Sequence, residues 1–188
     1  MLNSRDITAV AQCRRRYYLV VFLAGSTTDP EDFEWPEPLE DTPPDIKDAI
    51  CDISIGWKTA PTSATARRNL DHAATHLRHN EVARDALSVV DLAASKGREQ
   101  TRIGYSPCLT ETRAKSSSFV LVRGHDTSRV RNLILQDCSR LQGFTDQIFK
   151  RHSSVLSSRN HLEALGNAVT LPVARALIMQ CLPHLCKK

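Results

Sequence analysis

The stretch Arg131-Asn-Leu-Ile-Leu-Gln-Asp-Cys-Ser-Arg-Leu-Gln-Gly-Phe144 is the most informative part of this sequence. Its residues favour a helix from Leu133 to Leu141. The run from Cys138 to Phe144, with Asp146 shortly after it, is a combination that chance rarely produces. The elements on either side of this stretch decide how the chain folds.

Downstream of this stretch the sequence predicts a closing helix from Leu171 to Leu185. Pro172 stands near its first turn, where the fixed φ of proline is tolerated. The apolar residues that this helix carries are Val173, Leu177 and Leu182. Just before it, Leu165-Gly-Asn-Ala-Val169 contains a Gly-Asn pair, which favours a turn that ends one segment and starts the next.

Upstream, the first predicted element is a strand. Residues Arg16-Tyr-Tyr-Leu-Val-Val-Phe-Leu23 combine β-branched and aromatic side chains without a polar interruption. This pattern is typical of a strand buried on both faces, as found in α/β sheets. The following segment, Asp29 to Pro44, is acidic and rich in proline, which excludes regular structure and indicates a connection between two lobes.

The middle of the chain predicts helices followed by loops and a small sheet. A short helix is expected from Asp45, as its cap, to Ile53. Residues 65–95 are rich in helix formers. The apolar stripe of that helix would consist of Leu77, Val82, Leu87, Val90 and Leu92. Between Lys96 and Arg129, frequent glycine, serine and proline predict loops, with one strand at Ser118 to Val122.

The net charge of +4 is unevenly distributed along the 188 residues. Residues 29–52 hold ten Asp or Glu and a single basic residue, Lys47, whereas the rest holds 24 Lys and Arg against 11 Asp and Glu. Such a basic excess favours a polyanionic partner, because Lys and Arg that contact phosphates release counterions. A solvated basic surface is the alternative.

Composition also bounds the compartment and the metal chemistry. The six cysteines form no CxxC pair and no zinc-ribbon spacing, so reduced thiols are expected. Three histidines share a face of the predicted helix without a partnering carboxylate motif, which favours a solvated face over a metal site: His72, His76 and His79. The start of the chain to Arg16 is polar, and the apolar run Tyr17 to Ala24 is too short for a bilayer. We expect a protein of the cytoplasm or nucleus without a membrane partner.

Three separated stretches, in this order, resemble the last blocks of the cytosine-5 DNA methyltransferase family. They are Leu2–Asp6 with Gln12–Arg16 (LNAxD…QxRxR in the family), Arg131–Phe144 (RxLTxRECxRLQGFPD) and Leu165–Ala176 (GNAVPPxxA). Together they extend nearly from one end of the chain to the other. The second block is mainly architectural in the family, where it supports the recognition lobe against the catalytic lobe.

The resemblance implies roles for individual residues. Arg16 would touch the flipped cytosine, and Arg14 would order the active site, with Gln12 in the same block. A guanidinium suits this place because cysteine attack on carbon 6 drives charge onto the ring carbonyl. Asn167, with Ala168, would lie on the side of the cofactor S-adenosylmethionine. Without the resemblance, the three arginines read as a basic entrance to a strand.

A further short stretch resembles part of the family's target-recognition region. Ser106-Pro-Cys-Leu-Thr110 is similar to the Pro-Thr-Leu signature, with Cys108 where threonine is usual. The family threonine contacts a DNA backbone phosphate, which makes Cys108 and Thr110 implied DNA contacts, although a thiol is the poorer donor. Arg113 and Lys115 follow in a serine-rich loop that suits phosphates, or that faces solvent.

The expected fold class is α/β: a partial Rossmann-like methyltransferase lobe, with its last strands and closing helix, and an inserted small α+β target-recognition lobe. Residues 1–28 and 131–188 would belong to the catalytic lobe, and residues 29–130 would form the linker and target-recognition region. The family's glycine-bearing cofactor loop, its Pro-Cys-Gln nucleophile loop and its Glu-Asn-Val stretch do not occur in this sequence.

The sequence therefore predicts the carboxy-terminal part of a methyltransferase, inactive alone, because catalysis needs thiolate, cofactor and extruded base in one pocket. Its partners would be duplex DNA and an amino-terminal half, with S-adenosylmethionine shared between the halves. A non-catalytic DNA-binding or regulatory protein derived from the family is the alternative, as is a decayed fragment. Departures from the family pattern that favour decay lie at Thr8–Ala11, Cys108, Leu135 and Thr145.

Overall fold

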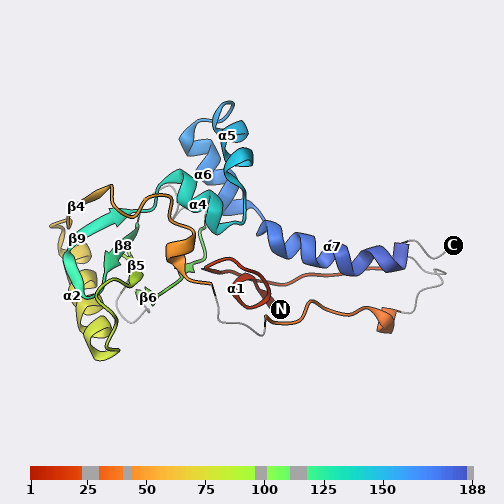
Figure 1. The fold of residues 1–188 in the computed structure, drawn as a ribbon, viewed down its shortest axis with the longest axis horizontal. Helices are drawn as coiled ribbons and strands as arrows, with labels where there is room; N and C mark the ends of the chain where they lie inside the picture. Colours follow the sequence, from red (N-terminus) through yellow and green to blue (C-terminus); the bar gives the residue numbers. More distant parts are fainter. Residues whose placement is uncertain (23–29, 40–43, 96–100, 111–117, 186–188) are drawn as a thin grey trace.

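The computed structural model describes residues 1–22, 30–39, 44–95, 101–110 and 118–185. The fold is mixed α/β, as expected from the sequence. Figure 1 shows a sheet with one helix against it at one end, a cluster of helices in the middle, and a long helix that runs beside the amino-terminal segment at the other end.

The main sheet has five strands in the order β4-β9-β8-β5-β6, and every neighbouring pair is antiparallel. The strands are β4 (Trp57–Thr59), β5 (Leu87–Asp91), β6 (Thr101–Ile103), β8 (Phe119–Arg123) and β9 (Asp126–Asn132). Side chains alternate between the two faces of such a sheet. In β8, Val120 and Val122 therefore belong to one buried cluster, whereas Phe119 and Leu121 belong to another.

One face of the sheet is covered by α2 (Ala64–His79). Leu70, Ala73 and Leu77 on this helix pack against the valines of β5, β8 and β9. Ser63 caps the helix, since its side chain accepts a hydrogen bond from the amide of Ala66 at 3.4 Å. The polar face of α2 is exposed and carries the three histidines, so their expected solvated position is confirmed.

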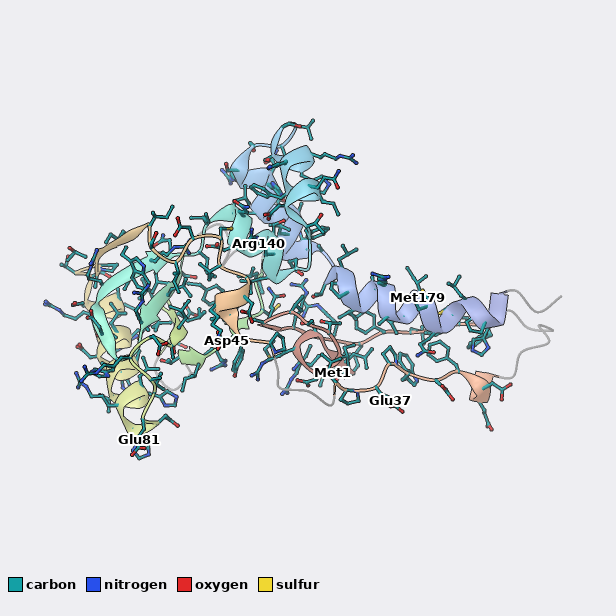
Figure 2. The ribbon with its side chains drawn as sticks, in the orientation of Figure 1. Met1, Glu37, Asp45, Glu81, Arg140 and Met179 are labelled. Carbon is teal, nitrogen blue, oxygen red and sulfur yellow. The ribbon has the colours of Figure 1, made fainter. Side chains whose placement is uncertain are left out.

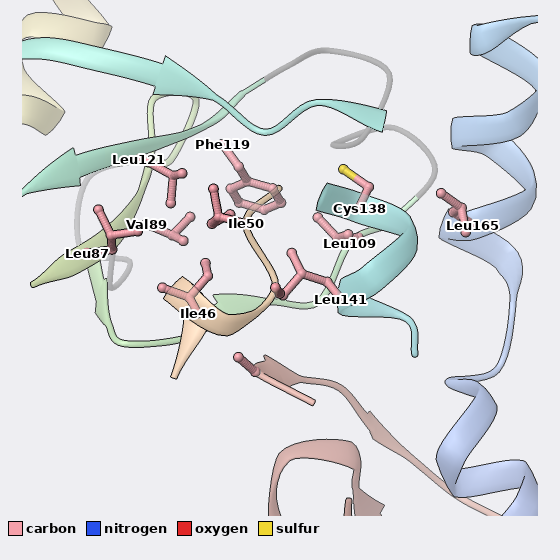
Figure 3. Close-up of a cluster of buried hydrophobic side chains, with 12 residues drawn as sticks. Ile46, Ile50, Leu87, Val89, Leu109, Phe119, Leu121, Cys138, Leu141 and Leu165 are labelled. Carbon is pink, nitrogen blue, oxygen red and sulfur yellow. The ribbon is translucent and has the colours of Figure 1, made fainter. Parts of the chain in front are cut away.

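The other face of the sheet is covered by elements from distant parts of the chain (Figure 3). A short 3-10 helix, η2 (Ile46–Asp48), contributes Ile46, and α4 (Leu135–Leu141) contributes Cys138 and Leu141. Leu165 from a later helix completes this cluster. The sheet is thereby joined to the helices at the end of the chain by one continuous apolar core.

A buried ion pair fixes the join between β9 and α4. Arg131 and Asp137 are 1% and 0% exposed, and Nη1 lies 2.6 Å from Oδ2. The same carboxylate accepts hydrogen bonds from the amides of Ile134 at 3.0 Å and Cys51 at 3.0 Å. Each charge is therefore paired and hydrogen-bonded, which makes its burial tolerable.

Three further helices follow α4: α5 (Asp146–Ser153), α6 (Ser158–Asn167) and α7 (Leu171–Leu185). The side chains of Thr145 and Ser157 cap α5 and α6. The closing helix α7 has the bounds expected from the sequence, and Val173 is buried, but Leu182 is 41% exposed. No element was predicted over α5 and most of α6.

The amino-terminal segment forms small pairings instead of a long strand. β1 (Leu2–Asn3) pairs with β3 (Arg15–Arg16), and β2 (Gln12–Cys13) pairs with β7 (Ser106–Pro107), on either side of the one-turn helix α1 (Ser4–Ile7). Residues 17–22 run beside α7 (Figure 1) and pair with no strand in the described parts of the chain.

The expectation of a strand buried on both faces over Arg16–Leu23 is therefore wrong for its described part. Tyr17, Leu19 and Val21 are 85%, 87% and 77% exposed. The alternate residues face inward: Phe22 contacts Phe33 and His184, with ring centroids 6.0 and 5.6 Å apart. One face of the segment is covered and its other face is open, because no neighbouring strand or helix of the described chain lies there.

The expected helix over residues 65–95 is also wrong in its second half. α2 ends at His79, and Glu81 has a φ of 49°, outside the helical range. Residues 87–91 form β5, whose β-branched Val89 and Val90 pair with β8. The predicted strand at 118–122 and the helix near 133–141 are confirmed as β8 and α4. Asp45 does act as a cap, but η2 is a single turn.

Among the described residues, no single helix is long and apolar enough to cross a bilayer. The pair α6 and α7, bent by 42° at their junction, meets that requirement only together and only by length and composition.

Gly143 tests the junction between α4 and α7. Its φ is +80°, and a Cβ would lie 2.6 Å from Pro172 Cγ, so Gly143→Ala combines left-handed strain with overpacking. We expect this change to lower the free energy of unfolding by about 2–4 kcal/mol. Gly104→Ala is the control, because Gly104 has a similar φ of +75° but its nearest neighbour is 3.5 Å away. It should cost only about 1 kcal/mol in a denaturant titration. Equal effects would contradict the close packing at Gly143.

Candidate functional site

The centre of the candidate site is the buried guanidinium of Arg14. Arg14 is 3% exposed. Its Nη1 donates to the Leu109 carbonyl at 3.0 Å, and its Nη2 donates to the carbonyls of Gly166 at 3.1 Å and Ala168 at 2.6 Å. One side chain thus joins three segments that are far apart in the sequence. We call Arg14, Arg16, Cys108 and the residues 166–168 the arginine corner.

Local pairing places Arg14 in this corner. Gln12 and Cys13 pair in parallel with Ser106 and Pro107, and the amide of Ser106 donates to Ala11 at 2.7 Å. This pairing brings the segment after Pro107 beside the segment after Cys13. Along the extended segment 12–16 side chains alternate, so Gln12 and Arg14 point inward whereas Arg15 is exposed.

The electrostatics of Arg14 follow from its burial. Desolvation lowers its pKa from the ordinary value, Arg16 acts in the same direction, and the thiol of Cys108 acts in the opposite one. An arginine remains charged across the physiological range despite such a shift. The three carbonyl oxygens satisfy most of its donors, which offsets the cost of burying the charge.

Arg16 lies at the exposed side of the same corner. Its Nη2 lies 3.6 Å from Cys108 Sγ, and Arg14 Nη1 approaches the same sulfur at 3.4 Å. Within the described chain, Arg16 otherwise donates only to the neighbouring carbonyl of Arg15, at 2.8 Å. Arg14 therefore organises the corner, whereas Arg16 is accessible to a ligand.

Buried polar atoms of Arg14, and of Gln12 two residues before it, have no hydrogen-bond partners in the described chain. Gln12 is completely buried, and neither Nε2 nor Oε1 of its amide has a hydrogen-bond partner there; Arg14 Nε is in the same position. Leaving such a group unpaired costs roughly 1–3 kcal/mol. The corner is thus incomplete as a hydrogen-bonding unit within these residues.

The residues expected on the cofactor side lie at the end of α6. Asn167 is the last residue of that helix and is exposed, whereas the carbonyls on either side of it, of Gly166 and Ala168, hold Arg14. The turn predicted from Gly-Asn is confirmed, because α6 ends here and α7 begins at Leu171. The side chain of Asn167 is therefore held at a defined place and faces outward.

Gln142 positions this turn, a role that the sequence did not reveal. Its Nε2 donates to the Leu165 carbonyl at 3.0 Å, its Oε1 accepts from Thr170 Oγ1 at 3.3 Å, and its own carbonyl accepts from the Leu171 amide at 2.9 Å. The glutamine of the Arg-Leu-Gln-Gly-Phe run thus brackets the Gly-Asn-Ala-Val turn on both sides. The feature that marks Gln142 as a positioning residue is its complete burial, and burial cannot be read from the sequence.

The expected DNA contacts are placed only in part. Cys108 is half-buried and lies in the arginine corner, and Thr110 is exposed at the end of a described segment. Arg113 and Lys115 lie outside the described residues. Over the described ranges, no three His, Cys, Asp or Glu side chains are arranged to hold a metal ion.

The mixed α/β fold is consistent with the class of protein expected from the three stretches, a cytosine-5 DNA methyltransferase. A family model described as C-5 cytosine-specific DNA methylase matches residues 1–182. The chain belongs to this family. A search of curated proteins found no match.

The helix α6 contains a buried histidine. His161 is 1% exposed, its ring stacks on Phe149 at 5.6 Å between centroids, and His152 lies 5.7 Å away. Neither ring nitrogen of His161 has a hydrogen-bond partner in the described chain. Desolvation, and then the charge of His152, lower its pKa.

This environment predicts an acid-sensitive α6. Because the pKa of His161 is lower folded than unfolded, the unfolded chain takes up a proton first, and stability falls as the pH drops below about 6.5. His161→Phe should remove this part of the pH dependence of the free energy of unfolding, whereas His72→Phe on the exposed face of α2 should leave it unchanged. An unaltered slope in His161→Phe would show that His161 is not buried in its neutral form.

Proposed function

We propose that this chain is the target-recognising, carboxy-terminal part of a cytosine-5 DNA methyltransferase and that it works together with an amino-terminal half. The observation that carries the proposal is the Arg14 clamp, which joins the Gln-x-Arg-x-Arg, Pro-Cys-Leu and Gly-Asn-Ala-Val stretches in one corner. These three stretches are the ones that the family resemblance assigns to base, DNA and cofactor.

Arg16 is our candidate for contact with the flipped base. It is exposed beside Cys108, and it carries a permanent charge that would stabilise charge developing on the cytosine carbonyl. Arg14 would keep Arg16 and Cys108 in place, and Gln12 would find its partners in the completed site. Cys108 and Thr110 would meet the DNA backbone, together with Arg113 and Lys115, which follow in the sequence.

S-adenosylmethionine is the cofactor we assign to the complete enzyme, where it supplies the methyl group. The residues at the end of α6 fit a share in its binding, because Asn167 presents an exposed amide from a turn that is held on both sides. Ala168 would line the same place. Both residues lie next to the arginine corner, as a site that combines cofactor and base requires.

The open apolar face supports an amino-terminal partner. Tyr17, Leu19 and Val21 are exposed on residues 17–22, and Ile178, Met179 and Leu182 are 59%, 56% and 41% exposed on the neighbouring α7. Figure 2 places Met179 on this helix. Apolar surface of this kind marks an interaction site. We assign it to the half that would bring the cofactor loop and the nucleophile.

We assign residues 1–28 and 131–188 to the catalytic lobe and residues 29–130 to the linker and recognition region. The run of residues 17–22 beside α7 supports the first assignment, and the separate cluster between α2 and the sheet supports the second. Since the substrate is duplex DNA, we place the protein where DNA is, in the cytoplasm or the nucleus.

The thiols support inactivity of this chain alone. Burial raises the pKa of Cys138 to about 12 and that of Cys51 to about 11, so neither is a thiolate at neutral pH. Cys108 follows a proline but lies against the two arginines, in the stretch that resembles the recognition signature. The nucleophile would come from the partner.

Labelled methyl transfer from S-adenosylmethionine to cytosine in duplex DNA tests the proposal. The chain alone should transfer none, and addition of an amino-terminal half from a family member that carries the missing blocks should restore transfer. In the restored enzyme Arg16→Gln should lower kcat roughly 100-fold, because it removes charge stabilisation at the base.

Arg15→Gln is the matched control, because Arg15 is exposed next to Arg16 but lies outside the corner. It should leave kcat within about twofold. Transfer by the chain alone, abolished by Cys108→Ser, would contradict the split arrangement. DNA binding without restored transfer would favour the non-catalytic alternative.

A further inference from the structure

A polar hollow lies on the five-stranded sheet, apart from the arginine corner. Its volume is about 350 Å³, and it is lined by Ser54, Trp57, Arg123, Asp126 and Arg129. These residues come from β4, the ends of β8 and β9, and the segment before β4. β4 is the edge strand opposite β6, and Figure 1 shows β4 and β9 at the end of the molecule remote from α1.

Two side chains of the hollow are fixed against each other. The guanidinium carbon of Arg123 lies 5.1 Å from the centroid of the Trp57 ring, within the range of a cation–π interaction. Arg123 Nη2 and Trp57 Nε1 both donate to the carbonyl of Ile53, at 3.2 and 2.7 Å. A register shift between Leu121 and Arg123 interrupts the ladder just where Arg123 leaves β8. Such bulges re-aim side chains.

The hollow is lined by two guanidinium groups and one carboxylate. Asp126 accepts hydrogen bonds from the amide of Ser128 at 2.9 Å and from its hydroxyl at 2.6 Å, so its carboxylate is engaged in its own turn. Arg129 is exposed. The hydrogen bonds from Ser128, and to a smaller extent the charge of Arg129, lower the pKa of Asp126, so Arg129 acts on the one carboxylate of the hollow. The guanidinium groups of Arg123 and Arg129 therefore border the hollow together with the indole ring of Trp57.

We propose that this hollow binds a nucleotide, with its phosphate between Arg123 and Arg129 and its base stacked on the Arg123 guanidinium that lies over Trp57. Guanidinium planes and aromatic rings are the platforms on which proteins stack unpaired bases, and arginine is suited to phosphate. The volume falls within the usual range of small-molecule sites, roughly 300–1,000 Å³. The nucleotide is either free or part of a nucleic-acid strand with an unpaired base, and both share this chemistry.

The fluorescence of Trp57 reports directly on this site. The chain has two tryptophans, so Trp35→Phe leaves Trp57 as the single reporter in the full chain. We expect a saturable change on titration with deoxyadenosine monophosphate, and at least about tenfold weaker binding of deoxyadenosine, which lacks the phosphate. A 5′-phosphorylated single-stranded oligonucleotide that binds more tightly than the monophosphate would identify the strand as the source. Equal affinities would identify the free nucleotide.

Variants separate binding from folding. Arg129→Gln should weaken monophosphate binding at least about tenfold, Arg129→Lys should keep part of it, and Lys58→Gln, on β4 next to Trp57 but outside the lining, should change nothing. No response of Trp57 at millimolar nucleotide, or full binding by Arg129→Gln, would overturn the proposal. Neither result depends on methyl transfer, so failure here leaves the proposed function standing.

Discussion

The structure depends on one buried charge. Arg14 enters the interior at the end of a two-residue pairing, and its burial is stable only while the carbonyls of Leu109, Gly166 and Ala168 accept its donors. These acceptors lie 95 to 154 residues further along the chain. Other contacts must therefore position each of these carbonyls near Arg14. The pairing of β7 with β2 positions Leu109, and Gln142 positions the turn after α6. The candidate site lies where these contacts converge.

A second buried charge connects this corner to the five-stranded sheet. Arg131 at the end of β9 and Asp137 in α4 form an ion pair that also holds the amide of Cys51. Removing one partner of such a pair costs about 3–5 kcal/mol, because the other charge stays buried alone. The apolar core of Figure 3 follows the same route, from the sheet through α4 to Leu165 in α6. Sheet and corner are thus joined by one continuous apolar core and one buried ion pair.

Sequence reasoning predicted the elements whose local pattern agrees with their surroundings. β8 and α7 are of this kind: the apolar run in β8 lies between two paired strands, and the proline of α7 stands at its first turn. Sequence reasoning failed where contacts between distant parts of the chain determine the secondary structure. Residues 87–91 became a strand because β8 lies beside them, and residues 17–22 remained open because no described strand does. At the site, the sequence stretches marked Arg14, Arg16 and Asn167, and the Ser106–Thr110 stretch marked Cys108. The contacts of Arg14 and Gln142 could not be predicted, because they depend on distances that no local pattern contains.

The most direct measurement of this account is amide hydrogen exchange in Arg14→Lys, since lysine keeps the charge but lacks the planar fork with which two separate Nη atoms reach the three carbonyls. The amides to follow are those of Ser106, bonded to Ala11, and Leu171, bonded to Gln142. The reference is the Leu92 amide, which is bonded to Ser118 where β5 ends and β8 begins. If Arg14 holds the corner together, exchange at Ser106 and Leu171 will accelerate together, by about tenfold or more, while Leu92 stays unchanged. Unchanged exchange at both sites would contradict the central place given to Arg14.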